Sequence, residues 1–558
     1  MGNQGDFKAQ VWIDGQGAAY PEQLPPYGVG TSTGICLSGG GTRALSAGMG
    51  QLRGLNQLGL IPHIDYISCV SGGSWLSSAY TYYRKGASSD AQFLGPQTGP
   101  SGTTFQWLGQ LDQGCIGFTA TQSLTAALAA TLALYKFGVI KSSHLIWIDS
   151  VGLVYLANYG LYDALHPHYY SLDANRVKEI VARNPQLSSG DFVTARVAQG
   201  GDPPRPYLVI NSSIASPSAV TPPPTGAETL VGFEYTPLYV GVQAPLRTFD
   251  FPDSRGPSVP VAIGGGVVEP FAFGGPGPSA GPVGPPTGAL VTVPDSGPGM
   301  PHRLTDATGT SSSAYVAEAE ELTITGLSPL ADYWPVTGAG ALPATGMDFG
   351  DGGNLENFGL IALLKRGVRN IVVFVNTSTK LKNFDVKKPP ATDDIDCDIP
   401  PLFGLAGCTE AMERNQVFAQ EAFSTVAQGL IDARYGTTPN GTVMFQSPLA
   451  VRDNAWWGLK GGWTANVLWV YNERVMRWEG QLPADVAQAI ADGNASKPSG
   501  PFQHFPNYLT MFQNSYTELV ELTAEQVNLL AALSCWNVTE NAATFKAFLT
   551  PTTQGEEG

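Results

Sequence analysis

The chain has 558 residues, of which 43% are hydrophobic, 10% are aromatic and 14% are charged. This composition excludes a largely disordered chain, which would be rich in charge and poor in aromatic residues, and the length is ample for a large buried core. The net charge of −16 disfavours nucleic acid and anionic lipid surfaces as partners, so we expect any lipid contact to be apolar.

The N-terminal segment, residues 1–28, is polar and rich in proline, and we interpret it as a lead-in to the folded part of the chain. It has no basic region followed by an apolar core, so no secretory signal is recognisable. The longest uncharged apolar stretch, about residues 124–135, is too short to span a bilayer. We therefore expect a cytoplasmic protein without a transmembrane segment.

Two strand–turn–helix units follow one another after the lead-in. A strand at 34–37 runs into the glycine-rich segment 38–43, and apolar residues then recur every three or four positions over 45–58, which predicts a helix with one buried face. A second strand at 65–70 leads into Ser-Gly-Gly at 71–73 and another helix. Repetition of this unit favours an α/β fold with a parallel sheet.

The remaining segments complete an α/β pattern with two insertions. Residues 89–200 are expected to be mostly helical, whereas 214–306 are dominated by proline, glycine and serine and are expected to form a loop, cap or lid. We predict one domain over 29–550, with a central mixed, largely parallel sheet flanked by helices. Further strands are expected at 207–211, 370–375 and 466–471, and an amphipathic helix near 411–433.

The six cysteines are too few and too scattered for a disulfide framework. Cys397 and Cys408 lie close enough in sequence to pair in an exported protein, but a reduced state is the simpler expectation for a chain without a recognisable signal peptide. We expect neither a metal site nor a cofactor.

The glycine-rich segment between the first strand and helix, Ser38 to Arg43, is the first candidate for chemistry. Glycines allow backbone N–H groups to point into open space, and the helix N-terminus adds partial positive charge. The segment would therefore suit a phosphate or the oxyanion of an acyl transfer, with Gly40 and Gly41 as donors. It matches neither a P-loop nor a dinucleotide-binding fingerprint. A tight turn without chemistry is the alternative.

Ser71 is the candidate nucleophile. A nucleophile elbow places serine on a strained turn between a strand and a helix, with small residues two positions before and two positions after it. Gly73 satisfies the later position, and Cys69 stands where the motif usually has glycine. Ser68 and Ser74 lack small residues on both flanks. An ordinary glycine-flanked turn is the alternative interpretation.

Asp351, followed by Gly352 and Gly353, is the candidate base. A carboxylate beside two glycines can act as a base, bind a metal or end a turn. None of the six histidines lies in a recognisable serine-partner motif, and a carboxylate can accept the serine proton directly. An ordinary aspartate pKa of about 3.9 makes it a weak base, so alignment and oxyanion stabilisation must compensate.

In this order the segments resemble the catalytic domain of cytosolic phospholipase A2 and of fungal lysophospholipases, within the patatin-like hydrolases. The resemblance covers about residues 30–470, most of the chain. It rests on segments 38–43, 66–75 and 351–357, with secondary matches at 233–237 and 309–313.

The resemblance implies a Ser–Asp dyad without histidine, in which Ser71 is the nucleophile and Asp351 its base, while Gly40 and Gly41 form the oxyanion hole. It further implies hydrolysis of acyl esters in phospholipids or lysophospholipids through an acyl-enzyme, with transient contact to a lipid interface. The alternatives are a broad esterase or neutral-lipid hydrolase on the same dyad, a non-catalytic lipid-binding relative, and a nucleotide-binding protein.

Two arginines and a tryptophan cluster receive weaker assignments. Arg43 is similar to a family arginine that supports the site and meets the phosphate, and Arg366 to one that binds the head group. An ordinary ion pair is the alternative for both. Trp456, Trp457 and Trp463 would suit either a lipid interface or the core.

Overall fold

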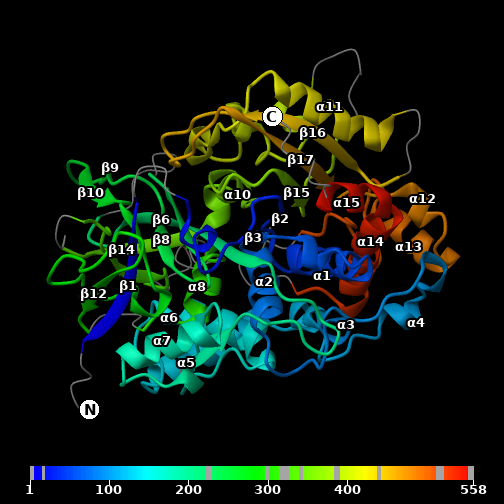
Figure 1. Cartoon of the computed structure of the whole chain (residues 1–558). Helices are drawn as coiled ribbons and strands as arrows, with labels where there is room; N and C mark the ends of the chain where they lie inside the picture. The colour runs from blue at the N-terminus through cyan, green and yellow to red at the C-terminus, as the bar shows by residue number, and fades with distance from the viewer. Residues whose placement is uncertain are drawn as a thin grey trace.

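A mixed 13-stranded β-sheet lies at the centre of the chain, and helices pack around it (Figure 1). The computed structural model describes residues 6–14, 19–166, 168–220, 229–295, 301–314, 326–338, 343–382, 390–436, 441–509 and 521–550. Within these residues no helix is long and apolar enough to cross a bilayer.

Five strands in the middle of the sheet run parallel, and their apolar residues face two cores. In the strand that precedes the glycine loop, Ile35 and Leu37 join one core and Cys36 joins the other. Burial on both faces explains why these strands read as continuous apolar runs. In spatial order they are β6 (Tyr207–Pro217), β3 (Tyr66–Val70), β2 (Thr33–Leu37), β15 (Asn370–Val375) and β17 (Trp463–Tyr471), and β16 (Met444–Val451) follows antiparallel at the edge.

The other half of the sheet is antiparallel and corrects two expectations. The lead-in contains a strand that pairs with two others, and the expected lid over 214–306 supplies four strands to the same sheet. Short strands between glycine and proline turns bury their apolar residues there rather than forming a loop. The strands are β7 (Val231–Tyr235), β8 (Val240–Val242), β11 (Gly266–Val268), β1 (Phe7–Ile13) and β12 (Ala289–Val293), with β9 (Arg247–Phe251) and β10 (Val259–Ile263) as a separate pair.

The segment 89–200 is helical only in part. Three of its α-helices have seven residues or fewer, and it also contains two strands that pair parallel to each other, apart from the main sheet. The elements are α3 (Asp90–Phe93), α4 (Phe105–Leu108), α5 (Leu124–Lys136), α6 (Leu145–Val151), α7 (Ala174–Arg183), β4 (Tyr169–Ser171) and β5 (Phe192–Thr194).

The helix after the glycine loop, α1 (Gly41–Gln57), is buried along almost its whole length. It packs closely on α14 (Ala524–Glu540), far away in sequence (Figure 1). A β-carbon on Gly50 would lie 2.2 Å from the carbonyl oxygen of Ala531, so the two backbones approach as closely as glycine allows. Helix α14 thereby supports α1, the helix that begins at the glycine loop.

The α/β fold with a mixed sheet flanked by helices is therefore confirmed, with a smaller parallel part than expected. The expected helix near 411–433 begins later, at Ala422. Further helices and strands are α2 (Gly72–Tyr82), α8 (Leu304–Thr310), β13 (Leu330–Tyr333), β14 (Thr345–Asp351), α10 (Leu360–Lys365), α11 (Ala422–Tyr435), α12 (Met476–Glu479), α13 (Ala484–Gly493) and α15 (Ala542–Leu549).

We expect Gly50→Ala to lower the free energy of unfolding by about 1–3 kcal/mol, because the added methyl group would overlap with the backbone of α14 at Ala531. Chemical denaturation followed by tryptophan fluorescence measures this change. Gly99→Ala is the control, since nothing lies within 4 Å of its β-carbon position. Equal stability of both variants would contradict the close packing of α1 on α14.

Candidate active site

Strand β6 brings the two candidate dyad residues together. Val70, the last residue of β3, pairs with Asn211, and Asp351, the last residue of β14, pairs with Ser212, the next residue along β6. Strand β7 pairs with one edge of β6 over Ile210–Ile214. Strands β3 and β14 therefore both pair with the other edge of β6, one after the other along its length. Ser71 directly follows β3, so the register of two strands places it beside Asp351.

The backbone at Ser71 has the strained geometry of a nucleophile elbow. Its φ of 51° and ψ of −123° are rare for a residue with a side chain, and it is the residue that precedes α2. A β-carbon on Gly72 would lie 2.1 Å from the Gly41 carbonyl oxygen, and one on Gly73 2.3 Å from that of Leu37. The elbow therefore touches the glycine loop. Cys69 is accommodated in the apolar core.

The hydroxyl of Ser71 donates a hydrogen bond of 2.9 Å to Oδ2 of Asp351, and both residues are buried. Asp351 also accepts the backbone N–H groups of Gly353 (2.7 Å) and Ala314 (3.3 Å). Burial raises the pKa of Asp351 to about 6, although these hydrogen bonds and that from Ser71 oppose the shift. The carboxylate is thus a stronger base than an exposed aspartate.

The glycine loop lies directly against the serine. A β-carbon on Gly39 would lie 3.0 Å from Cβ of Ser71, and φ values of 127° at Gly40 and 57° at Gly41 require glycine. The guanidinium of Arg43 occupies the space that a side chain at Gly40 would fill. The first residue of α1, Gly41, therefore lies directly beside the turn that carries Ser71.

Arg43, at the end of the glycine loop, connects this loop to two distant segments of the chain. It is buried and donates hydrogen bonds to the backbone oxygens of Asn376 (2.8 Å) and Tyr508 (2.6 Å). Such contacts support a role in holding the loop, whereas the expected contact with a substrate phosphate remains a prediction.

Arg366 lies in a buried ion-pair network. Its guanidinium contacts Glu22 at 2.8 Å and Glu234 at 2.7 Å, and it lies over the ring of Tyr20. The side chain is fully buried, so its charge is neutralised inside the protein. This placement corresponds to the ion-pair alternative and does not favour contact with a head group. The network joins the N-terminal segment to the sheet.

Ser311 is a site residue that the sequence did not single out. Its hydroxyl and carbonyl oxygens each accept the backbone N–H of Ser71 at 3.1 Å, and its hydroxyl donates to the carbonyl of Asn211 at 2.7 Å. Ser311 thus ties the elbow to β6. It lies in the 309–313 segment that contributed to the family resemblance without a role.

Asn357 connects the glycine loop to a third segment. Its carbonyl oxygen accepts the N–H of Gly39 at 3.0 Å, and its side-chain amide donates to Asp398 at 2.7 Å. Burial and the neighbouring Asp396 raise the pKa of Asp398. Nothing in the sequence pattern linked residues 357 and 398, which are 41 positions apart.

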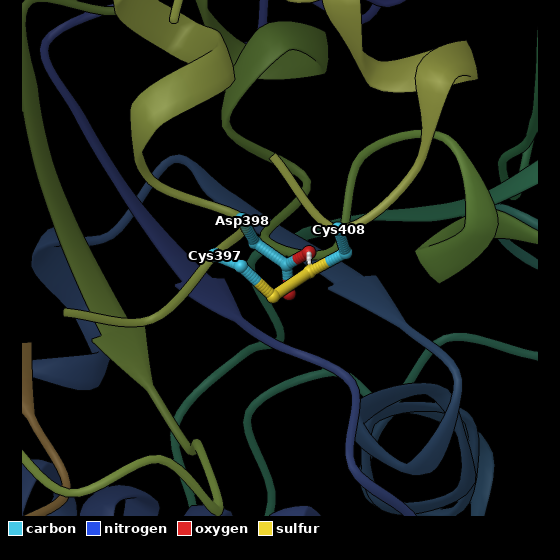
Figure 2. A group of neighbouring side chains, drawn as sticks. All are labelled: Cys397, Asp398 and Cys408. Atoms are coloured by element: carbon cyan, nitrogen blue, oxygen red, sulfur yellow. Dashed lines mark hydrogen bonds between the residues drawn. A yellow bond between two sulfur atoms is a disulfide. The ribbon is translucent and has the colours of Figure 1, made fainter. Parts of the chain in front are cut away.

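Cys397 and Cys408 flank Asp398 and form a disulfide, so the expectation that they stay reduced is wrong (Figure 2). Sγ of Cys408 lies 3.1 Å from a carboxylate oxygen of Asp398. These three residues are close enough to form a metal-binding group, but two sulfurs bonded to each other cannot serve as thiolate ligands. The disulfide instead closes the loop that carries Asp398.

The three tryptophans of the cluster pack at the edge of the hydrophobic core. Trp456, Trp457 and Trp463 are half-buried and pack against the core clusters. The indole N–H groups donate to Leu230, Asn415 and Lys460, respectively. These contacts favour the core interpretation over a lipid interface.

Comparison with known proteins gives one short sequence match. No family model matches the chain. Over 59 residues it is 49% identical to human cytosolic phospholipase A2 zeta and 48% identical to the mouse protein. The match covers 11% of this chain and 7% of each relative. The predicted resemblance to cytosolic phospholipase A2 is confirmed by this match.

Solved structures show a broad likeness. Human GIVD cytosolic phospholipase A2 aligns with 95% of this chain and 62% of its own, with 13% identity and a TM-score of 0.43. The same protein in complex with methyl gamma-linolenyl fluorophosphonate and terbium chloride aligns with a TM-score of 0.40, again with 13% identity, over 95% of this chain and 61% of its own. The chain thus spans about three-fifths of these solved chains. Its fold assignment rests on its own strand order.

We expect the double substitution Cys397→Ser and Cys408→Ser to lower the free energy of unfolding by about 2–3 kcal/mol, because the unfolded chain regains the entropy of an open loop. Denaturation with and without dithiothreitol measures the effect. Dithiothreitol should destabilise the wild type and leave the double variant unchanged. A wild type insensitive to reduction would show that the disulfide contributes nothing.

Proposed function

We propose that this protein is a serine-dependent lipid acyl hydrolase that cleaves carboxylic esters of phospholipids or lysophospholipids. One observation carries the proposal: the hydroxyl of Ser71 donates to the buried carboxylate of Asp351 at 2.9 Å, on a strained turn against a glycine loop. The short match to cytosolic phospholipase A2 zeta supports the same substrate class.

In the proposed reaction, Oγ of Ser71 attacks the ester carbonyl carbon while Asp351 accepts the hydroxyl proton. The negative charge on the carbonyl oxygen is stabilised by the backbone of Gly40 and Gly41 at the N-terminus of α1. When the C–O bond of the ester breaks, the leaving alcohol takes the proton from Asp351. An acyl group then remains on Ser71.

Water completes the cycle. Asp351 accepts a proton from water as the oxygen attacks the acyl carbonyl, and the same loop stabilises the second oxyanion. Collapse of this intermediate returns the proton to Oγ of Ser71 and releases the fatty acid. Throughout, the buried position of the dyad limits water around Asp351 and maintains its raised pKa. Arg43 would hold the loop in place.

We expect Ser71→Ala and Asp351→Asn each to reduce kcat by at least about 1,000-fold, because each removes a group that acts as a unit with the other. Release of fatty acid from phospholipid, lysophospholipid, triacylglycerol and short aryl esters measures the loss and ranks the substrates. A lipid fluorophosphonate should label the wild type and spare Ser71→Ala.

The controls for these variants are Ser189→Ala and Asp163→Asn, which change exposed serine and aspartate residues outside the candidate site. Both should retain wild-type rates. Full hydrolysis by a folded Ser71→Ala protein would refute the proposed function. If the protein prefers triacylglycerol or aryl esters, the proposed Ser–Asp dyad is supported, but the proposed phospholipid substrate class is wrong.

The pH dependence of the hydrolysis rate should reflect the pKa of Asp351, the proposed base. Asp351 must be ionised to accept a proton, and its pKa is raised to about 6. Activity should therefore be constant at higher pH and fall as the pH decreases through about 6, whereas an ordinary aspartate would sustain it to about pH 4. Initial rates from pH 4 to 8, with tryptophan fluorescence to verify folding, test this. A midpoint near 4 would contradict the raised pKa.

A further inference from the structure

One stretch of the chain differs from the rest in its charge. Between Asp112 and Asp163 the sequence has three charged residues, Lys136, Lys141 and Asp149. Asp149 is buried and accepts a hydrogen bond from Arg303 at 2.8 Å. Both lysines are exposed. On a chain of net charge −16, the exposed charge of this stretch is thus solely positive.

The same stretch exposes an apolar helix face. Helix α5 lies at the periphery of the molecule and packs on α6 (Figure 1). One side packs inward through Leu124, Ala127 and Thr131, and the opposite side has no charged residue along its centre. We define the α5 face as the exposed residues at helical spacing Ala126, Ala129, Ala130, Ala133 and Phe137, together with Leu153.

Two features make the α5 face more than an ordinary surface. Phe137 is 84% exposed and Leu153 is 40% exposed, so large apolar side chains project from it. Between α5 and Leu153 runs a groove of about 490 Å³, lined by Ala126, Ala130 and Val154 among others. Polar side chains, among them those of Gln122 and Asn158, also line the groove, so part of an acyl chain can lie along its apolar side.

The α5 face is connected to the dyad through a short series of contacts. Helix α5 packs on α6, and the ring of His144, directly before α6, is hydrogen-bonded to the carbonyl oxygen of Ser328 at 2.8 Å. Two residues later, Leu330 begins β13 and pairs with Asp348 on β14, the strand that ends at Asp351. Helix α6 also packs on α8, which leads into Ser311. The same elements therefore hold the face and the dyad.

We propose that the α5 face docks this protein onto a zwitterionic phospholipid surface, an inference that rests on the proposed function. Phe137 and Leu153 enter the boundary between head groups and acyl chains, as apolar side chains of interfacial helices do. Lys136 and Lys141 lie at the end of the face, where their ammonium groups meet lipid phosphates and their stems cover apolar surface.

Charge selects the zwitterionic surface over an anionic one. Two lysines complement individual phosphate groups, but the whole chain carries −16 and is repelled by a negatively charged membrane. Binding should therefore depend chiefly on buried apolar area and change little with salt. It should not increase when phosphatidylserine replaces part of the phosphatidylcholine.

The test measures docking apart from hydrolysis. Full-chain protein with Ser71→Ala is sedimented with phosphatidylcholine vesicles, and the partition coefficient is compared after addition of Phe137→Asp or Ala130→Asp. Each should reduce partitioning at least about tenfold, because a charge replaces apolar surface at the interface. Val283→Asp, at a residue 76% exposed outside the α5 face, should leave it unchanged.

The outcomes separate this inference from the proposed function. Equal partitioning of all variants, or equal loss with Val283→Asp, would overturn the docking surface even if the wild type hydrolyses lipid. Selective loss with Phe137→Asp would support it even if the wild type is inactive. Sedimentation velocity without lipid tests a third outcome, in which the protein is a dimer that Phe137→Asp dissociates. If vesicle binding is then unchanged by this substitution, the α5 face binds a second copy of the chain, and the inference is overturned.

With an otherwise wild-type chain, Phe137→Asp should slow hydrolysis of vesicle phospholipid and leave hydrolysis of a water-soluble short-chain ester unchanged. Equal slowing on both substrates would overturn a role at the interface.

Discussion

The candidate site depends on one shared strand edge. Strand β6 pairs with β3 up to Asn211 and with β14 from Ser212 onward, so the ends of two strands meet at consecutive residues. Backbone hydrogen bonds set this register, and a slip by one residue would turn side chains to the opposite face. The 2.9 Å contact between Ser71 and Asp351 is therefore a property of the sheet rather than of flexible loops.

Around this edge, other segments restrain what the strands bring together. Ser311 holds the backbone of the elbow, Arg43 holds the glycine loop, and Asn357 ties that loop to Asp398 beside the disulfide. Ser311 and Arg43 bind backbone groups of other segments, and the carbonyl oxygen of Asn357 accepts the N–H of Gly39. The long packing of α14 along α1 continues this support. The centre of the candidate site is thus held by contacts from several distant segments.

Local patterns predicted the motifs but not their surroundings. The strand before Ser71 and the helix after it were predicted because apolar runs and glycines act over a few residues. The sequence pattern does not reveal strand β1, because its partners β11 and β12 lie more than 250 residues away. Strands such as β8 and β11 have three residues each, so proline and glycine around them dominate the pattern. Arg366 matched a motif, yet only tertiary structure shows Glu22 and Glu234 beside it.

The separation of the dyad along the chain has a consequence for synthesis. Ser71 and Asp351 are 280 positions apart, and β14 must pair with β6 before the Ser71 hydroxyl meets the carboxylate. A nascent chain that has already formed β2, β3 and α2 therefore has the strained turn at Ser71 without the carboxylate of Asp351 beside it. The hydrogen bond between Ser71 and Asp351 can therefore form only after more than half of the polypeptide has emerged from the ribosome.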